Sequence, residues 1–464
     1  MRIFENKMKG VGANLASPDS RISLAPGNLG LGAHTGLSQN EKEWKQEVFH
    51  RIVKMLDLPM LASLDDSDAR SLIQETCEAV MAQESLPFNV PTRQRIIHEI
   101  ENEILGLGPL EQLLIDPNIS DILVNGPSQV YIEKHGKLEL SSVHFDNDLH
   151  LMTIIDRIVS RIGRRIDESS PMVDARLQDG SRVNAIIPPL AIDGPQLSIR
   201  RFSVECLTME HLIQLNEMTA TIARVLEAIV RGRLNVLISG GTGSGKTTLL
   251  NVLSTFIPTN ERIITIEDSA ELQLQQPHKV RLETRPPNIE GKGEVTQRDL
   301  LRNCLRMRPD RIILGEVRSA EALDMLQAMN TGHDGSLTTI HANSARDAMT
   351  RVESMVAMSG VELPTRQVRG QIASALDIII QLERQEDGVR RLISIQEVQG
   401  LEGEIITLSE IFRFQRREMD KDGSVLGDFV ATGIVPKFQE RLRQRGLDIG
   451  LEVYDPSLQS KLRE

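Results

Sequence analysis

The sequence is poor in aromatic residues and cysteines, and it contains no long apolar run. Only 3% of its 464 residues are aromatic, so a platform that stacks the bases of a single-stranded nucleic acid is not expected. The three cysteines, Cys77, Cys206 and Cys304, stand far apart without a CxxC pair. This argues against a disulfide framework or a zinc knuckle and favours a reducing compartment. No stretch reaches the ~18 apolar residues that a membrane span needs.

Acidic residues outnumber basic residues. Lys and Arg total 53 and Asp and Glu total 65, which gives a formal net charge of −12. Proteins that grip nucleic-acid phosphates are usually basic, so no nucleic-acid partner is expected. The first residues, MRIFENKMKGVG, contain no apolar signal core. Together these features predict a cytoplasmic protein that touches a membrane only through partner proteins.

Residue patterns predict four segments before the main domain. Residues 1–40 are rich in small and polar residues without a period, which predicts a disordered tail. Helical periodicity in residues 41–105 predicts a small helical bundle. Alternating runs cut by turn residues predict an α+β N-terminal domain over residues 106–201. Residues 202–220 are a candidate linker.

Residues 221–464 alternate short apolar runs with stretches of helical length. The runs are LNVLISG, RIITIE, RIILGE, SLTTIHA and DIIIQL. They predict an α/β fold with a mostly parallel sheet that helices cover on both faces. After Ile380, an EDG turn at 386–388 and a DG turn at 422–423 predict an antiparallel C-terminal extension.

A glycine-rich segment, GGTGSGKTT, follows the first of these runs and precedes a predicted helix. It fits the P-loop pattern G-x-x-x-x-G-K-[ST], in which backbone N–H groups and a helix N-terminus face a phosphate. We expect Lys246 to reach the β and γ phosphates of ATP and the Thr247 hydroxyl to bind Mg²⁺. The predicted nucleotide-binding residues of the loop are Gly240, Gly241, Thr242, Gly243, Ser244, Gly245, Lys246, Thr247 and Thr248.

Two acidic residues stand at the ends of predicted strands, where ligands of open α/β sheets bind. RIILGE resembles a Walker B strand, but Gly315 occupies the position of the usual aspartate. Glu316 is therefore predicted to polarise the attacking water. Glu267, which ends RIITIE, is the second carboxylate. We expect Thr247, Glu267 and Glu316 to be the metal-binding residues.

One histidine and four arginines complete the predicted site. His341 ends a strand of the same sheet, and it either senses the γ-phosphate or holds a catalytic carboxylate. Arg176, Arg182, Arg200 and Arg201 precede the candidate linker. Guanidinium groups suit phosphate, and an arginine supplied from another domain stabilises charge in the transition state. A hinge motion at the linker is one way to bring Arg200 and Arg201 onto the nucleotide.

Four boxes in order, GGTGSGKTT, ITIEDSAEL, RIILGEVR and GHDGSLTTIHA, resemble the type II/type IV secretion ATPase superfamily. The stretch 308–356 and the phrases ISDILVNG and RLQDGSRVNAIIPP are most similar to its tight-adherence (CpaF/TadA-type) pilus assembly branch. The tetracysteine zinc insert of the type II secretion branch is absent, which favours the pilus branch. The resemblance covers roughly residues 90–415.

The resemblance implies a hexameric ATPase with a RecA-like motor domain behind a flexible linker. Such a ring sits at the cytoplasmic face of an inner-membrane platform protein and drives pilin addition, and in some relatives retraction. The resemblance also implies roles for single residues. Glu316 matches the catalytic Walker B glutamate, Glu267 the acid of the "Asp box" and His341 the "His box" residue. The region that supplies phosphate-sensing arginines contains Arg176, Arg182, Arg200 and Arg201.

Two further functions remain open at this stage. A nucleic-acid translocase with the same core would require a basic channel, which the net charge disfavours. A nucleotide-gated scaffold would bind ATP without useful turnover, which the presence of both acids disfavours. A small-molecule kinase is a weaker alternative, because the sequence shows no sign of a lid or an acceptor pocket.

Overall fold

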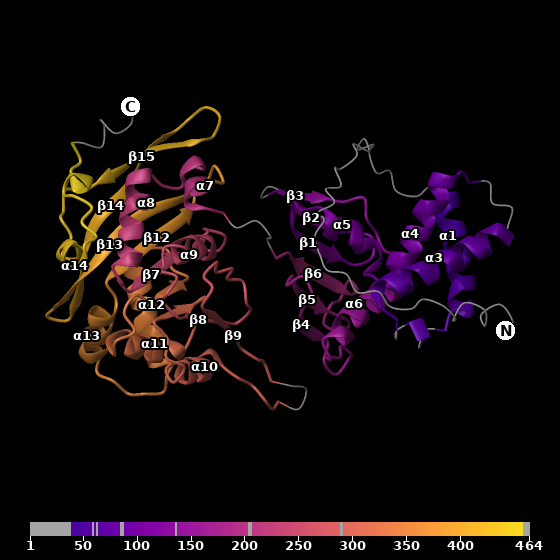
Figure 1. Ribbon diagram of the computed structural model, residues 1–464, viewed down its shortest axis with the longest axis horizontal. Coiled ribbons are helices and arrows are strands. Elements are labelled where there is room, and N and C mark those ends of the chain that lie inside the picture. The colour runs from indigo at the N-terminus through magenta and orange to yellow at the C-terminus, as the bar shows by residue number, and fades with distance from the viewer. Residues whose placement is uncertain are drawn as a thin grey trace, which may run out of the picture. The chain divides into compact units, whose positions relative to one another are not determined.

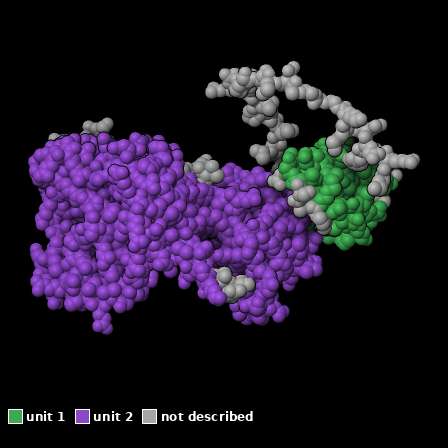
Figure 2. Space-filling model, turned by 60° about the horizontal axis from the view of Figure 1, so that its bottom comes forward, with its two compact units in different colours: residues 1–101 green, residues 102–464 purple. Residues whose placement is uncertain are grey.

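The computed structural model describes residues 39–57, 60–61, 64–83, 88–134, 137–202, 207–287 and 291–457 (Figure 1). All but the last two residues of the predicted tail, and residues 203–206 of the candidate linker, lie outside this description. The chain forms two compact units, residues 1–101 and residues 102–464, which Figure 2 distinguishes by colour.

The first unit contains the predicted helical bundle. Its helices are α1 (Gln39–Met55), α3 (Asp66–Gln83) and α4 (Val90–Ile104), whose last residues belong to the second unit. Each helix turns an apolar stripe inward, because its apolar residues recur every three or four positions. The fully buried side chains are Ile52, Ile73, Cys77, Ile96 and Ile100. Burial raises the pKa of the Cys77 thiol to about 12, so this cysteine is an inert core residue.

The second unit begins with an α+β domain. Its six-stranded antiparallel sheet has the order β3-β2-β1-β6-β5-β4, and helix α6 buries its apolar face against this core. The turn at Asp179 and Gly180 lies between β4 and β5, with Gly180 in the left-handed conformation that glycine favours. The elements are η1 (Gly108–Leu110), α5 (Glu111–Ile115), β1 (Ile119–Asn125), β2 (Val130–Lys134), β3 (Lys137–Leu140), α6 (Asp148–Arg161), β4 (Met172–Arg176), β5 (Arg182–Ile186) and β6 (Gln196–Arg200).

A nine-stranded sheet forms the centre of the motor domain, in the order β15-β14-β13-β12-β7-β11-β10-β8-β9. The strands from β12 to β9 in this order are parallel, and the rest are antiparallel (Figure 1). The five predicted apolar runs all form strands of the parallel part. The strands are β7 (Val236–Gly240), β8 (Ile263–Glu267), β9 (Lys279–Glu283), β10 (Arg311–Leu314), β11 (Leu337–Ile340), β12 (Ile378–Arg384), β13 (Arg390–Glu402), β14 (Ile405–Met419) and β15 (Val425–Ala431).

Helices cover both faces of this sheet, so adjacent strand residues enter different cores. Ile238 packs with helices α8 and α9, whereas its neighbour Leu237 packs with α11, α12 and α13. Burial on both faces explains why the central strands β7, β8, β10 and β11 are buried at every position and rich in Ile, Leu and Val. The helices are α7 (Met209–Gln214), α8 (Ala220–Arg231), α9 (Lys246–Ser254), α10 (Gln297–Cys304), α11 (Glu321–Asn330), α12 (Ala345–Ala357), α13 (Thr365–Ala375), α14 (Phe438–Gln444) and η2 (Glu452–Tyr454). The α/β fold class is confirmed.

Helix α7 lies inside the segment that the sequence suggests as a linker. Its residues Met209 and Leu212 are buried in the same core as α8. Residues 207–220 are therefore attached to the motor domain, whereas the N–H of Phe202 donates to the Ser181 hydroxyl in the N-terminal domain. In the described ranges, no helix is long and apolar enough to cross a membrane.

Candidate functional site

The P-loop connects the carboxyl end of β7 to helix α9. Gly243 and Gly245 have φ angles of +70° and +93°, a region that side chains other than glycine rarely adopt. A Cβ atom at Gly240 would lie 2.6 Å from the carbonyl oxygen of Leu382, so a larger residue would collide with the neighbouring strand. The Ser244 hydroxyl donates a hydrogen bond to the Gly241 carbonyl at 2.9 Å. Sterics thus explain Gly240, Gly243 and Gly245, whereas a Cβ at Gly241 would meet no atom within 4 Å.

Lys246, the first residue of α9, points back across the loop. Its Nζ atom donates hydrogen bonds to the carbonyl oxygens of Gly240, at 3.0 Å, and Gly241, at 2.8 Å. The residue is only 7% exposed, and this burial lowers the pKa of its amine. A phosphate oxygen is a stronger acceptor for an ammonium group than a carbonyl is. The loop therefore holds the amine where a bound phosphate would attract it.

Glu316 and His341 meet beside Lys246. They follow β10 and β11, and parallel strands present their carboxyl ends at one edge of the sheet. His341 Nε2 lies 3.1 Å from Glu316 Oε1, and His341 Nδ1 lies 3.4 Å from Lys246 Nζ. Burial, and then the charge of Lys246, lower the pKa of the imidazole. A neutral ring donates through Nε2 to the carboxylate and accepts through Nδ1 from the amine.

Arg318 holds the second oxygen of the Glu316 carboxylate. Its Nη2 atom lies 2.7 Å from Glu316 Oε2, and its Nη1 atom lies 3.3 Å from Asp268 Oδ2. The ion pair with Glu316 raises the pKa of this guanidinium. The catalytic glutamate predicted from sequence is thus fixed from two sides, by His341 and by Arg318. The sequence predicts holding a carboxylate as one of two roles for His341, whereas it predicts no partner for Arg318.

Glu267 is buried at the end of β8, with 3% of its surface exposed. Its Oε1 atom accepts hydrogen bonds from the backbone N–H groups of Glu271 and Leu272, both at 2.8 Å. Its Oε2 atom is buried without a hydrogen-bond partner. Burial raises the pKa of this carboxyl to about 7. A buried oxygen without a partner is costly, so it marks a position where a ligand would be stabilising.

Glu267 lines a small cleft of about 50 Å³. Thr247 and Glu316 also line this cleft. A threonine hydroxyl and two carboxylates are hard oxygen donors that suit Mg²⁺, which usually takes its remaining ligands from water and phosphate. Thr247, Glu267 and Glu316 would hold such an ion. When bound, it would neutralise charge on the phosphate oxygens. The described residues contain no cluster of three or more His, Cys, Asp or Glu arranged as a metal site.

Gln297 also lines the cleft, and the sequence gives no signal for it. It is the first residue of α10, is 6% exposed, and its Oε1 atom is buried without a hydrogen-bond partner. Gln297 is thus a second lining residue with a buried oxygen that has no partner, which supports the identification of the cleft as a polar ligand site.

Two of the four predicted arginines contact the segment that follows β8, and the other two do not, as far as the structure describes the chain. Arg176 Nη2 lies 2.5 Å from Ser269 Oγ, and Arg182 Nη1 lies 2.5 Å from Glu271 Oε1, so both reach the acidic segment after β8. Arg182 also lines the cleft.

Arg201 instead donates to the Asp116 carbonyl inside the N-terminal domain. Among the described residues, neither Arg200 nor Arg201 forms a hydrogen bond or ion pair with the P-loop. The structure therefore brings two of the four predicted arginines to the site.

The sequence and fold place this chain among known proteins. The family model of the type II/IV secretion system proteins matches residues 103–402. The chain belongs to this family. It is 35% identical to a Mycobacterium tuberculosis protein named for conjugal transfer, over 71% of this chain and 95% of that protein. It is 32% identical to the type IV secretion system protein VirB11 of Bartonella quintana, over 62% of this chain and 93% of that protein.

Among solved structures, the chain is similar to the VirB11 ATPase of the Brucella suis type IV secretion system. The two are 28% identical, the match covers 63% of this chain and 96% of that chain, and the TM-score is 0.34.

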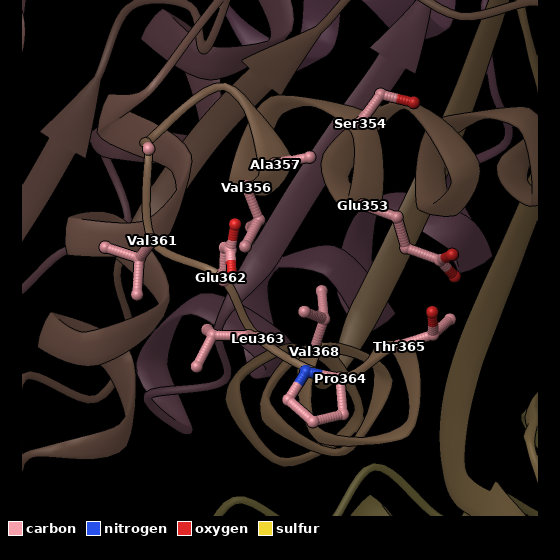
Figure 3. Close-up of a pocket in the computed structure, with 11 residues that line it drawn as sticks. Glu353, Ser354, Val356, Ala357, Val361, Glu362, Leu363, Pro364, Thr365 and Val368 are labelled. Carbon is pink, nitrogen blue, oxygen red and sulfur yellow. The ribbon is translucent and has the colours of Figure 1, made fainter.

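A larger cavity of this secretion-family protein lies away from the P-loop. It has a volume of about 920 Å³ and lies between the end of α12 and the start of α13. Figure 3 shows Glu353, Val356, Leu363 and Val368 around it. None of the predicted site residues lines this cavity, so its size does not connect it with the phosphate chemistry.

Proposed function

We propose that the chain is an ATP-hydrolysing motor that works as an oligomer, by analogy a hexamer. The observation that carries the proposal is the continuous contact from Lys246 through His341 to Glu316 at the mouth of a P-loop. A nucleotide-binding loop alone indicates binding, whereas a fixed carboxylate beside it also supplies a group that orients water. The family supports the same activity, since its named relatives serve secretion and conjugal transfer.

Each group has a distinct task in this proposal. The loop amides and Lys246 bind the β and γ phosphates, and Thr247, Glu267 and Glu316 would hold Mg²⁺. Glu316 accepts a hydrogen bond from the attacking water and orients it toward the γ-phosphate. His341 and Arg318 hold that carboxylate in place. Arg176 or Arg182, supplied by the N-terminal domain, stabilises the charge that develops on the transferred phosphoryl group.

We further propose that this motor powers assembly of a tight-adherence pilus or a related secretion machine. It would act in the cytoplasm, at the face of an inner-membrane platform protein, and touch the membrane only through that partner. The resemblance of residues 308–356 to the pilus branch supports this role, and the names of the relatives support envelope transport more broadly. A conjugal or type IV secretion motor is the nearest alternative.

A phosphate-release assay with Mg²⁺ and ATP tests the activity. Wild-type protein is expected to hydrolyse ATP steadily. Lys246→Ala is expected to abolish turnover, because it removes the positive charge that stabilises the transferred phosphoryl group. Binding of ATP without release of phosphate would favour the nucleotide-gated scaffold. Stimulation by added DNA would favour a translocase. Sizing with and without a non-hydrolysable ATP analogue tests assembly, and a chain that stays monomeric with nucleotide would contradict the ring.

A further inference from the structure

The hairpin formed by β12 and β13 lies directly against the P-loop. β12 is the parallel neighbour of β7, and Leu382 pairs with Gly240 at the point where the loop begins. The chain turns at residues 385–389 and returns as β13. Side chains near this turn therefore lie beside the loop on the β12 side. His341 and Glu316 approach it from the opposite side, because β11 and β10 follow β7 in the sheet.

Two arginines of this hairpin reach the loop glycines. Arg390 Nε donates a hydrogen bond to the Gly243 carbonyl at 3.0 Å, and its Cδ atom lies 3.1 Å from the position that a Cβ at Gly245 would take. Arg384 Nη1 lies 3.9 Å from the corresponding position at Gly243. Both side chains are exposed. The two guanidinium groups thus border the same stretch of the P-loop.

Arg384 and Arg390 also stand directly opposite each other in the antiparallel pair. Like charges in this arrangement destabilise a hairpin, typically by a few tenths of a kcal/mol up to about 1 kcal/mol. The acids of the turn do not compensate them, because Asp387 pairs with Arg391 and Glu386 pairs with Arg416.

In the described ranges, neither Arg384 nor Arg390 forms an ion pair with a carboxylate. Glu217, which is 7% exposed, senses the charge of Arg390, but burial is the larger effect and raises the pKa of this carboxyl. A pair of exposed, unneutralised guanidinium groups is suited to a phosphate, which each can bind through two N–H groups.

We propose that Arg384 and Arg390 clamp the nucleoside side of the bound nucleotide, at its α-phosphate. This inference rests on the proposed ATP-binding function. The reacting γ-phosphate must lie near Glu316, on the β11 and β10 side of the loop. The other end of the polyphosphate chain then extends toward β12, where the arginine pair stands. The clamp therefore contributes equally to the binding of ATP and ADP. The chemical step takes place on the other side of the P-loop, next to Glu316.

Binding measurements on single and double variants test the clamp. The variants are Arg384→Ala, Arg390→Ala and their combination, with Arg413→Ala as the matched control. Arg413 is an exposed β14 arginine that pairs with Glu410 at 3.8 Å. The probes are Mg²⁺-ADP and a non-hydrolysable Mg²⁺-ATP analogue. Each clamp variant is expected to weaken the binding of both probes roughly tenfold, the value of one charged hydrogen bond. The control should bind like wild type.

The melting temperature separates a ligand role from a structural role. Among the described residues, the Arg384 side chain forms no hydrogen bond with the loop, and Arg384→Ala removes its like-charge contact with Arg390. Without nucleotide, this variant should therefore melt no lower than wild type. Its stabilisation by ADP should shrink. A lower melting temperature with undiminished stabilisation by ADP would overturn the clamp. Loss of ATP-analogue binding with intact ADP binding would also overturn it, because the pair would then face the γ-phosphate.

The same experiment distinguishes the clamp from the proposed function. If wild type binds neither probe, the ATP-binding proposal fails and the clamp fails with it. If wild type binds both and the double variant binds equally well, the clamp alone is wrong.

Discussion

The side chain of Glu267 fills the space beside Gly315. A Cβ atom at position 315 would lie 3.0 Å from Glu267 Cγ, which is closer than nearly all real contacts of this kind. Gly315 stands where a Walker B strand usually carries aspartate, one residue before Glu316. The acid that β10 lacks is therefore supplied by β8, the neighbouring parallel strand. The position of Glu267 thus gives a steric reason for a glycine at position 315, at the end of β10.

Restoring the missing aspartate should harm the enzyme. We expect Gly315→Asp to reduce phosphate release strongly, because the new side chain displaces Glu267 from the cleft. Overpacking of this kind also costs about 1–3 kcal/mol of stability. Phosphate release and urea unfolding measure the two effects. The double variant Gly315→Asp/Glu267→Ala should recover part of the activity, since it removes the collision and keeps one carboxylate.

A matched glycine provides the control for this test. Gly370 lies within α13, and a Cβ there would meet no atom within 4 Å. Gly370→Ala should therefore keep activity and gain about 0.4–1 kcal/mol of stability through lower backbone entropy in the unfolded chain. Full activity of Gly315→Asp would contradict the steric argument.

Glu316→Gln should separate binding from hydrolysis. The amide keeps the size of the carboxylate and a carbonyl oxygen for His341, but it loses the charge that orients water. We expect kcat to fall about 10²- to 10³-fold with little change in KM. Steady-state kinetics with Mg²⁺ and ATP measures this, and Glu418→Gln, at an exposed position of β14, should behave like wild type. A variant at position 316 with wild-type kcat would remove Glu316 from the mechanism.

His341 is expected to be a positioning residue. Since it bridges Glu316 and Lys246 at 3.1 and 3.4 Å, His341→Ala should lower kcat by roughly 10- to 100-fold. His341→Gln keeps an N–H donor for the carboxylate and should retain more activity. His333 belongs to the same sequence box, but in the described ranges its ring is hydrogen-bonded to the Ala328 carbonyl and not to Glu316 or Lys246, so His333→Ala should leave kcat unchanged. Equal losses for the Ala and Gln variants at position 341 would argue against positioning by a hydrogen bond.

Local patterns predicted the elements of the motor domain well, whereas contacts between distant residues were out of reach. The runs around Ile238 and Ile264 are buried at every position because both sheet faces are covered, and their Ile, Leu and Val residues made them recognisable. The edge strand β9 was missed, because it alternates exposed charged residues with half-buried ones.

The partners of the arginines were likewise out of reach of local sequence patterns. Arg311 and Arg318 stand in one dense group in the sequence, yet Arg311 is fully buried against Glu261 while Arg318 holds Glu316. Their partners are 50 and 2 residues away, and only the fold decides which charge each arginine meets. The sequence around Arg311 and Arg318 alone could not show which arginine forms an ion pair in the core and which belongs to the site.

The turn that carries the arginine clamp should lose stability in acid. Asp387 binds Arg391 through both oxygens and also accepts from the N–H of Val389 and of Val425. The Arg391 contact, first among these causes, lowers the pKa of Asp387 from 3.8 to about 2. Because the folded pKa is the lower one, this contribution is complete above pH ~4 and disappears as pH falls through 2.

Asp387→Asn should therefore destabilise the protein by about 2 kcal/mol at pH 7, and the difference from wild type should shrink between pH 4 and 2. Urea unfolding across this range measures it. Asp422→Asn, in the exposed turn between β14 and β15, is the control and should have no effect at either end. A difference that stays constant down to pH 2 would show that the carboxylate charge does not stabilise this turn.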